Sequence, residues 1–423
     1  MTSDSAPLTR ERQQEMNPKS ITIIGINYSP EKTGIAPYTS GLAENLAAAG
    51  YEVCVITAYP HYPEWRIAEG YNGLSRTEFI RGVAVHRKRS YVPSNPSPFT
   101  RLMLEATFAI RAIFSNWKDP DVIISVTPSL ISTLAVQLRL KLIHKSRRAA
   151  LGIWVQDLYG LGVAETGTLS GRSAKLMSKV ESYSLRNASR VAVIHDRFKD
   201  VLTNTMGIDR GRVDVVRNWN HSKLEKLDDR DNERHRLTWA DDEFVVLHAG
   251  NMGVKQGLHS VIEAAKLAQS RCLKIKFILL GDGNQRKSLQ SLAGSCTHVR
   301  FLDPLPDDQF SRAIQAADAL LVNELESLSS MAVPSKLTTY FASGVPIIAA
   351  TDSKSVTAGE ISASGAGITV TPNDPEALLR SVEILRSDPK YARAIGLNGP
   401  IFRDRNLSEN AAMSSMQDWI AKI

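Results

Sequence analysis

Residues 21–60 read ITIIGINYSPEKTGIAPYTSGLAENLAAAGYEVCVITAYP and predict one β-α-β unit. An apolar, β-branched run comes first, a segment with helical periodicity follows over residues 36–50, and a second apolar run begins at residue 51. Gly, Asn, Ser and Pro residues separate the first strand from the helix. Because strands that alternate with helices form parallel sheets, this stretch indicates an α/β fold.

The same alternation continues along both halves of the chain. In the first half, strands are predicted in DVIISVTPS, ALGIWVQDLY and SRVAVIHD, with helices near residues 130–145 and 173–187. In the second half, helices separate EFVVLHAGN, KIKFILLGDG, VRFLDPL, ALLVN and VPIIAAT. We therefore expect two Rossmann-like, doubly wound domains that face each other across a cleft, with ligands at the carboxyl ends of the strands.

Changes in composition suggest where the domains begin and end. An unstructured tail is expected over residues 1–19, an N-terminal domain over 20–222 and a C-terminal domain over 223–400. Residues 221–242 are polar and densely charged, which predicts a linker and a connecting helix. The last segment, 401–423, has helical periodicity with no strand after it, and it could pack on either domain.

The overall composition excludes several classes of protein. With 423 residues, 43% of them hydrophobic and 22% charged, the chain is neither a disordered protein nor a small stapled module. Cys54, Cys272 and Cys296 lie far apart, which argues against a disulfide framework or a zinc site. The first twenty residues lack the apolar core of a signal peptide, and no run approaches the roughly 18 apolar residues of a membrane span. We expect a cytoplasmic location.

The charge is distributed unevenly along the chain. Residues 1–220 carry 28 Lys and Arg against 19 Asp and Glu, whereas the remaining residues have a slight excess of acids. This imbalance is compatible with an ordinary solvated surface or with an N-terminal half that meets an anionic partner. Nucleic acid is disfavoured as that partner, because no RNA-binding aromatic motif or zinc-finger spacing is present.

A segment of the basic half has the pattern of an interfacial helix. Residues 98–117 place Phe99, Leu102, Met103, Ala106, Ile110, Ile113 and Trp117 at helical spacing. A helix packed on the sheet and a helix lying on a membrane are both consistent with this stripe. The neighbouring run HRKRS, residues 86–90, favours the membrane interpretation, in which Arg87, Lys88 and Arg89 contact anionic lipid.

Two nucleotide-binding motifs are absent from the first loop. Lys32 and Thr33 follow Gly25 at P-loop spacing, but Glu31 occupies the position of the second glycine, and there is no G-x-G-x-x-G. What remains is Thr33 and Gly34 at the start of a helix, where free backbone N–H groups favour an anion, although Gly34 could be an ordinary turn glycine.

The second half offers more candidates for binding a diphosphate. HAGNMGVKQGL brings Asn251 and Lys255 towards the start of a helix, and GDGN places Gly281 and Gly283 at another strand-to-helix turn. In VPSKLTTYFASG, Ser335 and Lys336 open a helix, so that backbone donors and a full positive charge meet there. A solvated lysine is the alternative for Lys336. A diphosphate held at this place would be neutralised without a metal ion.

Two residues of the first half are candidates for the sugar or acceptor. Asp157 in WVQDLY follows a strand, where it could cap a helix or orient a substrate. His61 in YPHYPEW follows the second apolar run and is either a surface loop histidine or a residue of the same cleft.

Four strings in order give the chain a resemblance. The chain resembles retaining GT-B glycosyltransferases of family 4 in these four strings: GINYSPEKTGIAPYTSGLAENLAAAGYEVCVITAYPHYPEW, the NW pair at 218–219, GNMGVKQGLHSVIEAA and VPSKLTTYFASGVPIIA. The similarity is greatest to the bacterial exopolysaccharide and O-antigen branch, which contains the colanic acid fucosyltransferase and the N-acetylfucosamine transferases. It spans most of residues 20–350.

The resemblance implies an activity and its partners. The C-terminal domain would bind a UDP- or GDP-sugar and the N-terminal domain a glycan acceptor linked to polyprenyl diphosphate, with transfer retaining the anomeric configuration. No cofactor or metal is expected, and the enzyme would be peripheral on the inner face of the cytoplasmic membrane. A sugar-nucleotide epimerase of the same fold and a non-catalytic sugar-nucleotide-binding subunit are the alternatives.

The chain also departs from the pattern of the family. Met331 and Thr339 stand where many members have two glutamates, which puts the ribose contacts in doubt. Asn251 and Gln256 replace a basic pair, which places more of the phosphate charge on Lys336, and Gln156 replaces the basic partner of Asp157. The catalytic candidates are accordingly Asp157, Lys336 and His61.

Overall fold

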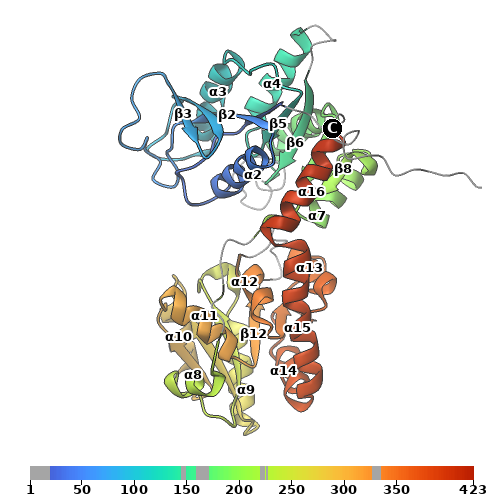
Figure 1. The fold of residues 1–423 in the computed structure, drawn as a ribbon. Helices are drawn as coiled ribbons and strands as arrows, with labels where there is room; N and C mark the ends of the chain where they lie inside the picture. The colour runs from blue at the N-terminus through green and yellow to red at the C-terminus, as the bar shows by residue number, and fades with distance from the viewer. Residues whose placement is uncertain (1–19, 144–148, 159–170, 220–223, 225–226, 326–334) are drawn as a thin grey trace, which may run out of the picture. The chain divides into compact units, whose positions relative to one another are not determined.

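The computed structural model describes residues 20–143, 149–158, 171–219, 224, 227–325 and 335–423. The chain forms two compact units: the first contains residues 1–218 and 412–423, and the second residues 219–411. Each unit has its own mainly parallel sheet with helices on it (Figure 1), so the predicted α/β fold with two Rossmann-like domains is confirmed.

In the described part of the first unit, the sheet has eight strands in the order β3-β4-β2-β1-β5-β6-β7-β8. Among the described strands, only the β3–β4 pair is antiparallel. The strands are β1 (Ser20–Ile24), β2 (Glu52–Ala58), β3 (Ser75–Ile80), β4 (Val83–Lys88), β5 (Val122–Val126), β6 (Ala150–Val155), β7 (Arg190–Val193) and β8 (Val213–Val215). The central strands are mostly apolar and buried because helices cover both faces.

The helices of the first unit fill the connections between strands. They are α2 (Ala36–Ala48), α3 (Pro98–Ile113), α4 (Leu130–Leu142), α6 (Gly171–Arg186), α7 (Asp196–Asp200), the π-helix η2 (Val201–Thr205) and the 3-10 turn η3 (Arg210–Arg212). Helix α3 begins with a capping box, in which the Ser97 hydroxyl accepts the Thr100 N–H and Thr100 in turn accepts the Ser97 N–H.

As far as the structure describes the second unit, its sheet has six parallel strands in the order β11-β10-β9-β12-β13-β14. They are β9 (Phe244–Ala249), β10 (Ile275–Leu280), β11 (Val299–Leu302), β12 (Ala319–Asn323), β13 (Ile347–Ala350) and β14 (Gly367–Val370). Successive residues of β9 alternate between two core clusters, with Val245 and Leu247 in one and Val246 in the other. The sheet is therefore the middle layer of three.

Two sets of helices, which share α15 (Pro389–Asn406), close the two faces of this second sheet. Apolar side chains of α9 (His259–Ser270), α10 (Arg286–Ala293) and α14 (Pro375–Ser387) contribute to one cluster. The other cluster takes side chains from α11 (Asp307–Ala316), α12 (Ser335–Ser343), α13 (Val356–Ser364) and α15. The 3-10 turn η4 (Val254–Gln256) lies between β9 and α9.

The C-terminal segment consists of two helices, α15 and α16 (Glu409–Ala421), and α16 packs on the first unit. A Cβ atom at Gly152 of β6 would approach Trp419 and Ile423 to within 2.7 and 2.6 Å, so the missing side chain makes room for the helix. Lys422 forms an ion pair with Asp214 of β8 at 3.1 Å. The sequence had left open which domain this segment covers.

The β3–β4 hairpin corrects the interpretation of the basic run at residues 86–90. Arg87 was expected to contact lipid, but its side chain is fully buried. Its guanidinium donates to Glu78 Oε2 at 2.5 Å and to the Ser29 carbonyl. Because side chains alternate along a strand, Arg87 faces inward while Lys88 faces the other side.

Helix α3 is apolar on two faces. Leu104, Phe108 and Ala112 are buried, whereas Phe99, Met103 and Ile110 of the predicted stripe are exposed. Trp117 does not belong to an exposed stripe, because it is buried beyond the end of the helix. Among the described residues, no helix is long and apolar enough to cross a bilayer.

Part of the predicted linker is a packed element of the second unit. Helix α8 (Arg230–Arg236) lies against α11, with Glu233 and Arg234 buried. Arg234 binds Asp318 at 2.9 Å and donates to the carbonyls of Ala240 and Glu243. Satisfied hydrogen bonds allow charged residues to enter a core, which the composition of residues 221–242 did not suggest.

Candidate functional site

The carboxyl edge of the second sheet contains a topological switch point between β9 and β12. The chain leaves β9 towards β10 on one side and returns to β12 on the other, so the loops after β9 and β12 diverge there. The Asn323 side chain donates to the carbonyls of Gln256 and Gly257 at 2.8 and 3.1 Å. Leu325 N–H donates to the Lys255 carbonyl at 3.1 Å, so the two loops form one connected rim.

Helix α12 places Lys336 on this rim. Lys336 and Tyr340 are four residues apart and lie on one face of the helix. The Tyr340 hydroxyl accepts the Ala249 N–H at 2.9 Å, which fixes the helix to the end of β9. The Lys336 Nζ atom lies 3.4 Å from His248 Nε2, and a Cβ atom added at Gly250 would come 3.5 Å from it.

The electrostatic environment of Lys336 favours an anionic ligand. Burial lowers the pKa of Lys336 to about 8, and the charge of Glu324 acts in the opposite direction. His248 is completely buried, and burial together with Lys336 holds the pKa of His248 well below its ordinary value. A neutral His248 can accept a hydrogen bond from the ammonium without adding charge.

Glu324 has hydroxyl partners at the same edge. Its carboxylate accepts from Thr351 at 2.5 Å and from Thr357 at 3.1 Å. Glu324 therefore links the end of β12 to α13.

Gly281 and Gly283 allow the loop after β10 to pack against the loop after β9. A Cβ atom at Gly281 would come within 2.1 Å of the Gly250 carbonyl oxygen, and one at Gly283 within 2.5 Å of the Met252 carbonyl oxygen. Met252 N–H donates to the Asp282 carbonyl at 2.8 Å. Both glycines have positive φ, at +134° and +158°, so they shape the predicted donor site through the backbone.

The remaining donor-site candidates take different positions. Asn251 is exposed beside this loop, and its carbonyl lies 3.4 Å from His248 Nε2. Lys255 is exposed in η4 and does not lie in the first turn of α9, because Gly257 at φ +54° separates the two elements. Ser335 begins α12, but its side chain, like Met331, lies outside the described part of the chain.

At the carboxyl edge of the first sheet, Glu31 ties two loops together. Its carboxylate accepts the backbone N–H groups of His61 and Tyr62 at 2.8 and 2.9 Å, and the Asn27 amide at 2.9 Å. His61 Nδ1 lies 2.8 Å from the Tyr59 carbonyl, to which it donates. His61 is buried and differs from an ordinary surface loop histidine.

Thr33 and Gly34 precede α2 and are exposed. Gly34 adopts φ +65°, which only glycine tolerates readily, and the Tyr62 ring stands over it. Helix α2 starts at Ala36, with Pro37 in its first turn. The predicted anion position is therefore open to solvent, next to the loop that holds His61.

Asp157 lies just beyond β6 at the same sheet edge. Its Oδ1 atom accepts the Leu158 N–H at 2.8 Å, and the Thr127 hydroxyl donates to its carbonyl at 3.1 Å. The preceding Gln156 makes a reciprocal amide pair with Asn218, at 3.1 and 2.7 Å. This pair connects the loop after β6 to the end of the first unit.

Comparison with known proteins agrees with these features. Residues 33–219 match the glycosyl transferase 4-like domain, and residues 229–401 match the glycosyl transferases group 1 family. The chain is 31% identical over 384 residues to the putative colanic acid biosynthesis glycosyl transferase WcaI of Escherichia coli strain K12, covering 88% of this chain and 93% of that protein. The chain belongs to the group 1 glycosyltransferases.

Solved glycosyltransferase structures share the fold. Anabaena HepE in complex with UDP aligns with a TM-score of 0.64 at 15% identity, covering 96% of this chain and all of that one. WaaG, a glycosyltransferase involved in lipopolysaccharide biosynthesis, aligns with a TM-score of 0.57 at 17% identity, covering 93% and 98%. The two Rossmann-like units of this glycosyltransferase are those of the GT-B fold.

The fold of this glycosyltransferase brings the candidates together in two groups. The rim of the second sheet holds the donor-site candidates Lys336, Asn251, Lys255, Gly281 and Gly283. The carboxyl edge of the first sheet holds the other candidates, Thr33, Gly34, His61 and Asp157. Sequence reasoning missed His248, Tyr340 and Asn323. His248 and Asn323 stand inside apolar strands, where each resembles a core position, and Tyr340 continues the apolar face of a helix. A polar residue at the carboxyl end of a parallel strand was the available signal.

Proposed function

We propose that this glycosyltransferase moves a sugar from a UDP- or GDP-sugar to a glycan acceptor linked to polyprenyl diphosphate, with retention, in exopolysaccharide or O-antigen synthesis. The observation that carries the proposal is the partly buried Lys336 at the switch point of the second sheet, held against the end of β9. The similarity to the colanic acid enzyme and the UDP bound in HepE support it.

In this proposal Lys336 stabilises the leaving diphosphate. As the bond between the sugar and the diphosphate breaks, negative charge develops on the phosphate oxygens and positive charge on the sugar. The Lys336 ammonium and the backbone N–H groups at the start of α12 act where the negative charge develops. This supply of positive charge makes catalysis independent of a divalent metal.

The first unit then supplies the acceptor side. His61 is held rigidly by Glu31, and Asp157 stands at the carboxyl end of β6. Positions of this kind suit residues that orient a hydroxyl or the donor sugar. The enzyme works at the inner face of the cytoplasmic membrane, because its donor is made in the cytoplasm and a polyprenyl diphosphate acceptor keeps its head at the lipid surface.

The function is tested with a panel of UDP- and GDP-sugars, each with and without a lipid-linked glycan extract. We expect transfer of one sugar to the lipid fraction, in the anomeric configuration of the donor and unaffected by a chelator. Epimerised donor without acceptor would indicate an epimerase, and tight binding without turnover a binding subunit. Activity that vanishes with chelator and returns with manganese would overturn the metal-free mechanism.

Lys336→Ala tests the role of the lysine. A charge-assisted hydrogen bond to phosphate contributes about 1.5–3 kcal/mol, so donor affinity should fall about ten- to hundredfold. Isothermal calorimetry with the identified donor measures this change. Lys390→Ala, an exposed lysine of α15, is the matched control and should bind donor as the wild type does. Wild-type affinity in Lys336→Ala would remove the assignment.

A further inference from the structure

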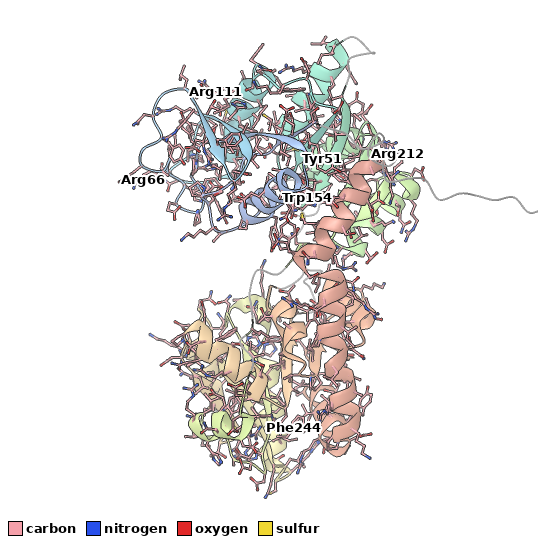
Figure 2. The ribbon with its side chains drawn as sticks, in the orientation of Figure 1. Tyr51, Arg66, Arg111, Trp154, Arg212 and Phe244 are labelled. Atoms are coloured by element: carbon pink, nitrogen blue, oxygen red, sulfur yellow. The ribbon has the colours of Figure 1, made fainter. Side chains whose placement is uncertain are left out.

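An open groove of about 500 Å³ lies on the first unit between the β3–β4 hairpin and the second half of α3. Leu74 and Lys88 line it from the hairpin side, and Ile110, Arg111 and Phe114 from the helix side. Arg111 is labelled in Figure 2. None of the residues that line the groove is a candidate catalytic residue.

The rim of the groove is unusually apolar for a surface in water. Phe114, Leu74 and Ile110 are 83%, 64% and 58% exposed, and Phe79 on the neighbouring strand β3 is 77% exposed. Single exposed apolar side chains are common, but several around one groove mark an interaction site.

Two cations face the same groove without a carboxylate between them. Within the described part of the chain, neither the Lys88 ammonium nor the Arg111 guanidinium makes a hydrogen bond or an ion pair. Burial lowers the pKa of Lys88, and repulsion from the nearby Arg111 charge lowers it further. Arg87, one residue earlier, is instead buried and donates to Glu78 and to the Ser29 carbonyl.

We propose that this groove docks the protein on a bilayer by holding the phosphate of an anionic phospholipid between Lys88 and Arg111. Leu74, Ile110 and Phe114 then enter the acyl region. The cations complement the headgroup, and the apolar rim complements the chains, so charge and hydropathy agree on one occupant. The inference rests on the membrane location in the proposed function and assigns it to particular residues.

The docking groove lies at one end of α3, and the loop that contains the catalytic candidate His61 lies at the other. Arg101 in the first turn stacks on Trp65, in the loop that follows His61, with the guanidinium carbon 5.1 Å from the ring centre. Ile110 follows nine residues later on the same helix, which is about 14 Å along its axis. Substitutions in the groove should therefore leave the loop that contains His61 intact.

Flotation with vesicles tests the proposal on the full chain. Phosphatidylcholine vesicles with and without phosphatidylglycerol are the probes, and Lys88→Gln/Arg111→Gln is the variant. We expect the wild type to float with the anionic vesicles and the variant to partition about 30-fold more weakly, since each charge near an anionic surface contributes about 1 kcal/mol. Phe114→Ser should lose the part of binding that survives high salt.

Lys287→Gln/Lys390→Gln is the matched control, because it removes two exposed charges from the second unit. It should float like the wild type, and thermal melting should show that all variants fold. Equal flotation of the groove variant and the control would overturn the proposal, as would a wild type that binds no anionic vesicle. A wild-type dimer that Phe114→Ser makes monomeric would assign the groove to a second copy and also overturn it. Donor turnover is measured separately, so failure of the proposed function is distinguishable.

Discussion

Lys336, the residue proposed to bind the diphosphate, is partly buried, and burial lowers its pKa to about 8. His248, buried with its Nε2 atom 3.4 Å from the ammonium, can accept a hydrogen bond from it without a charge of its own. An acidic partner in its place would neutralise the lysine before a donor arrived. The neutral partner leaves the positive charge available to the diphosphate.

The affinity for a nucleotide sugar should therefore depend on pH through Lys336. Below a pKa of about 8 the lysine is charged, and above it the free enzyme loses that charge, so Kd should rise up to tenfold per pH unit from about pH 8 upward. The diphosphate of a nucleotide sugar does not titrate in this range. Calorimetric titrations across this range check the prediction, and Lys336→Arg, which keeps its charge, should give a flat profile. An identical slope in both proteins would contradict it.

At the scale of elements, α3 connects the sheet to α4 through a buried carboxyl group. Glu105 Oε2 accepts the Ile131 N–H at 3.2 Å at the start of α4, where the N-cap residue Ser129 makes no side-chain cap. Burial raises the pKa of Glu105 to about 8, and the backbone hydrogen bonds from α4 act in the opposite direction. The folded protein thus keeps a proton that the unfolded chain releases.

Glu105→Gln should change how stability depends on pH. Between the unfolded value of 4.5 and the folded value of about 8, the folded state holds one more proton, so this residue's contribution falls as pH rises. The loss is about 1.4 kcal/mol per pH unit, and glutamine does not titrate. The melting temperature of the variant relative to the wild type should therefore rise between about pH 5 and pH 8. A constant difference between the two proteins would contradict this assignment.

At the scale of the whole molecule, the chain returns to its first unit at the C-terminus. Trp419 of α16 is completely buried and occupies the space left by Gly152 on β6. Residues separated by most of the sequence thus form one core, and the first unit is incomplete without the last twelve residues of the chain.

Trp419→Ala should destabilise the first unit and leave the second unit unaffected. Truncating a buried tryptophan costs about 3–5 kcal/mol. Amide hydrogen exchange should accelerate in β6 and β8 but not in β9 and β10, a contrast that follows from the division into units. Ile401→Ala on α15, where the side chain is half exposed, is the control and should change neither. Equal acceleration in both units would show that α16 is not specific to the first.

The sequence by itself determined the alternation of strands and helices, the doubly wound character of both halves and the place of Lys336 at the start of a helix. These features are local, because apolar periodicity and turn residues act over a few neighbouring positions. They also sufficed to exclude a P-loop, since Glu31 replaces a required glycine.

Only the tertiary structure decided which side chains face inward and what they meet. Arg87 and Lys88 are adjacent and chemically alike, yet pairing of β4 with β2 and β3 buries the first and leaves the second to the groove. From the sequence, His248 resembles a core residue, but in the structure Lys336 of α12 lies beside it. The sequence allows α16 to pack on either domain, and in the structure Trp419 of α16 packs against Gly152 of the first unit. Burial and pairing of this kind depend on contacts between residues far apart in the chain, which no local pattern encodes.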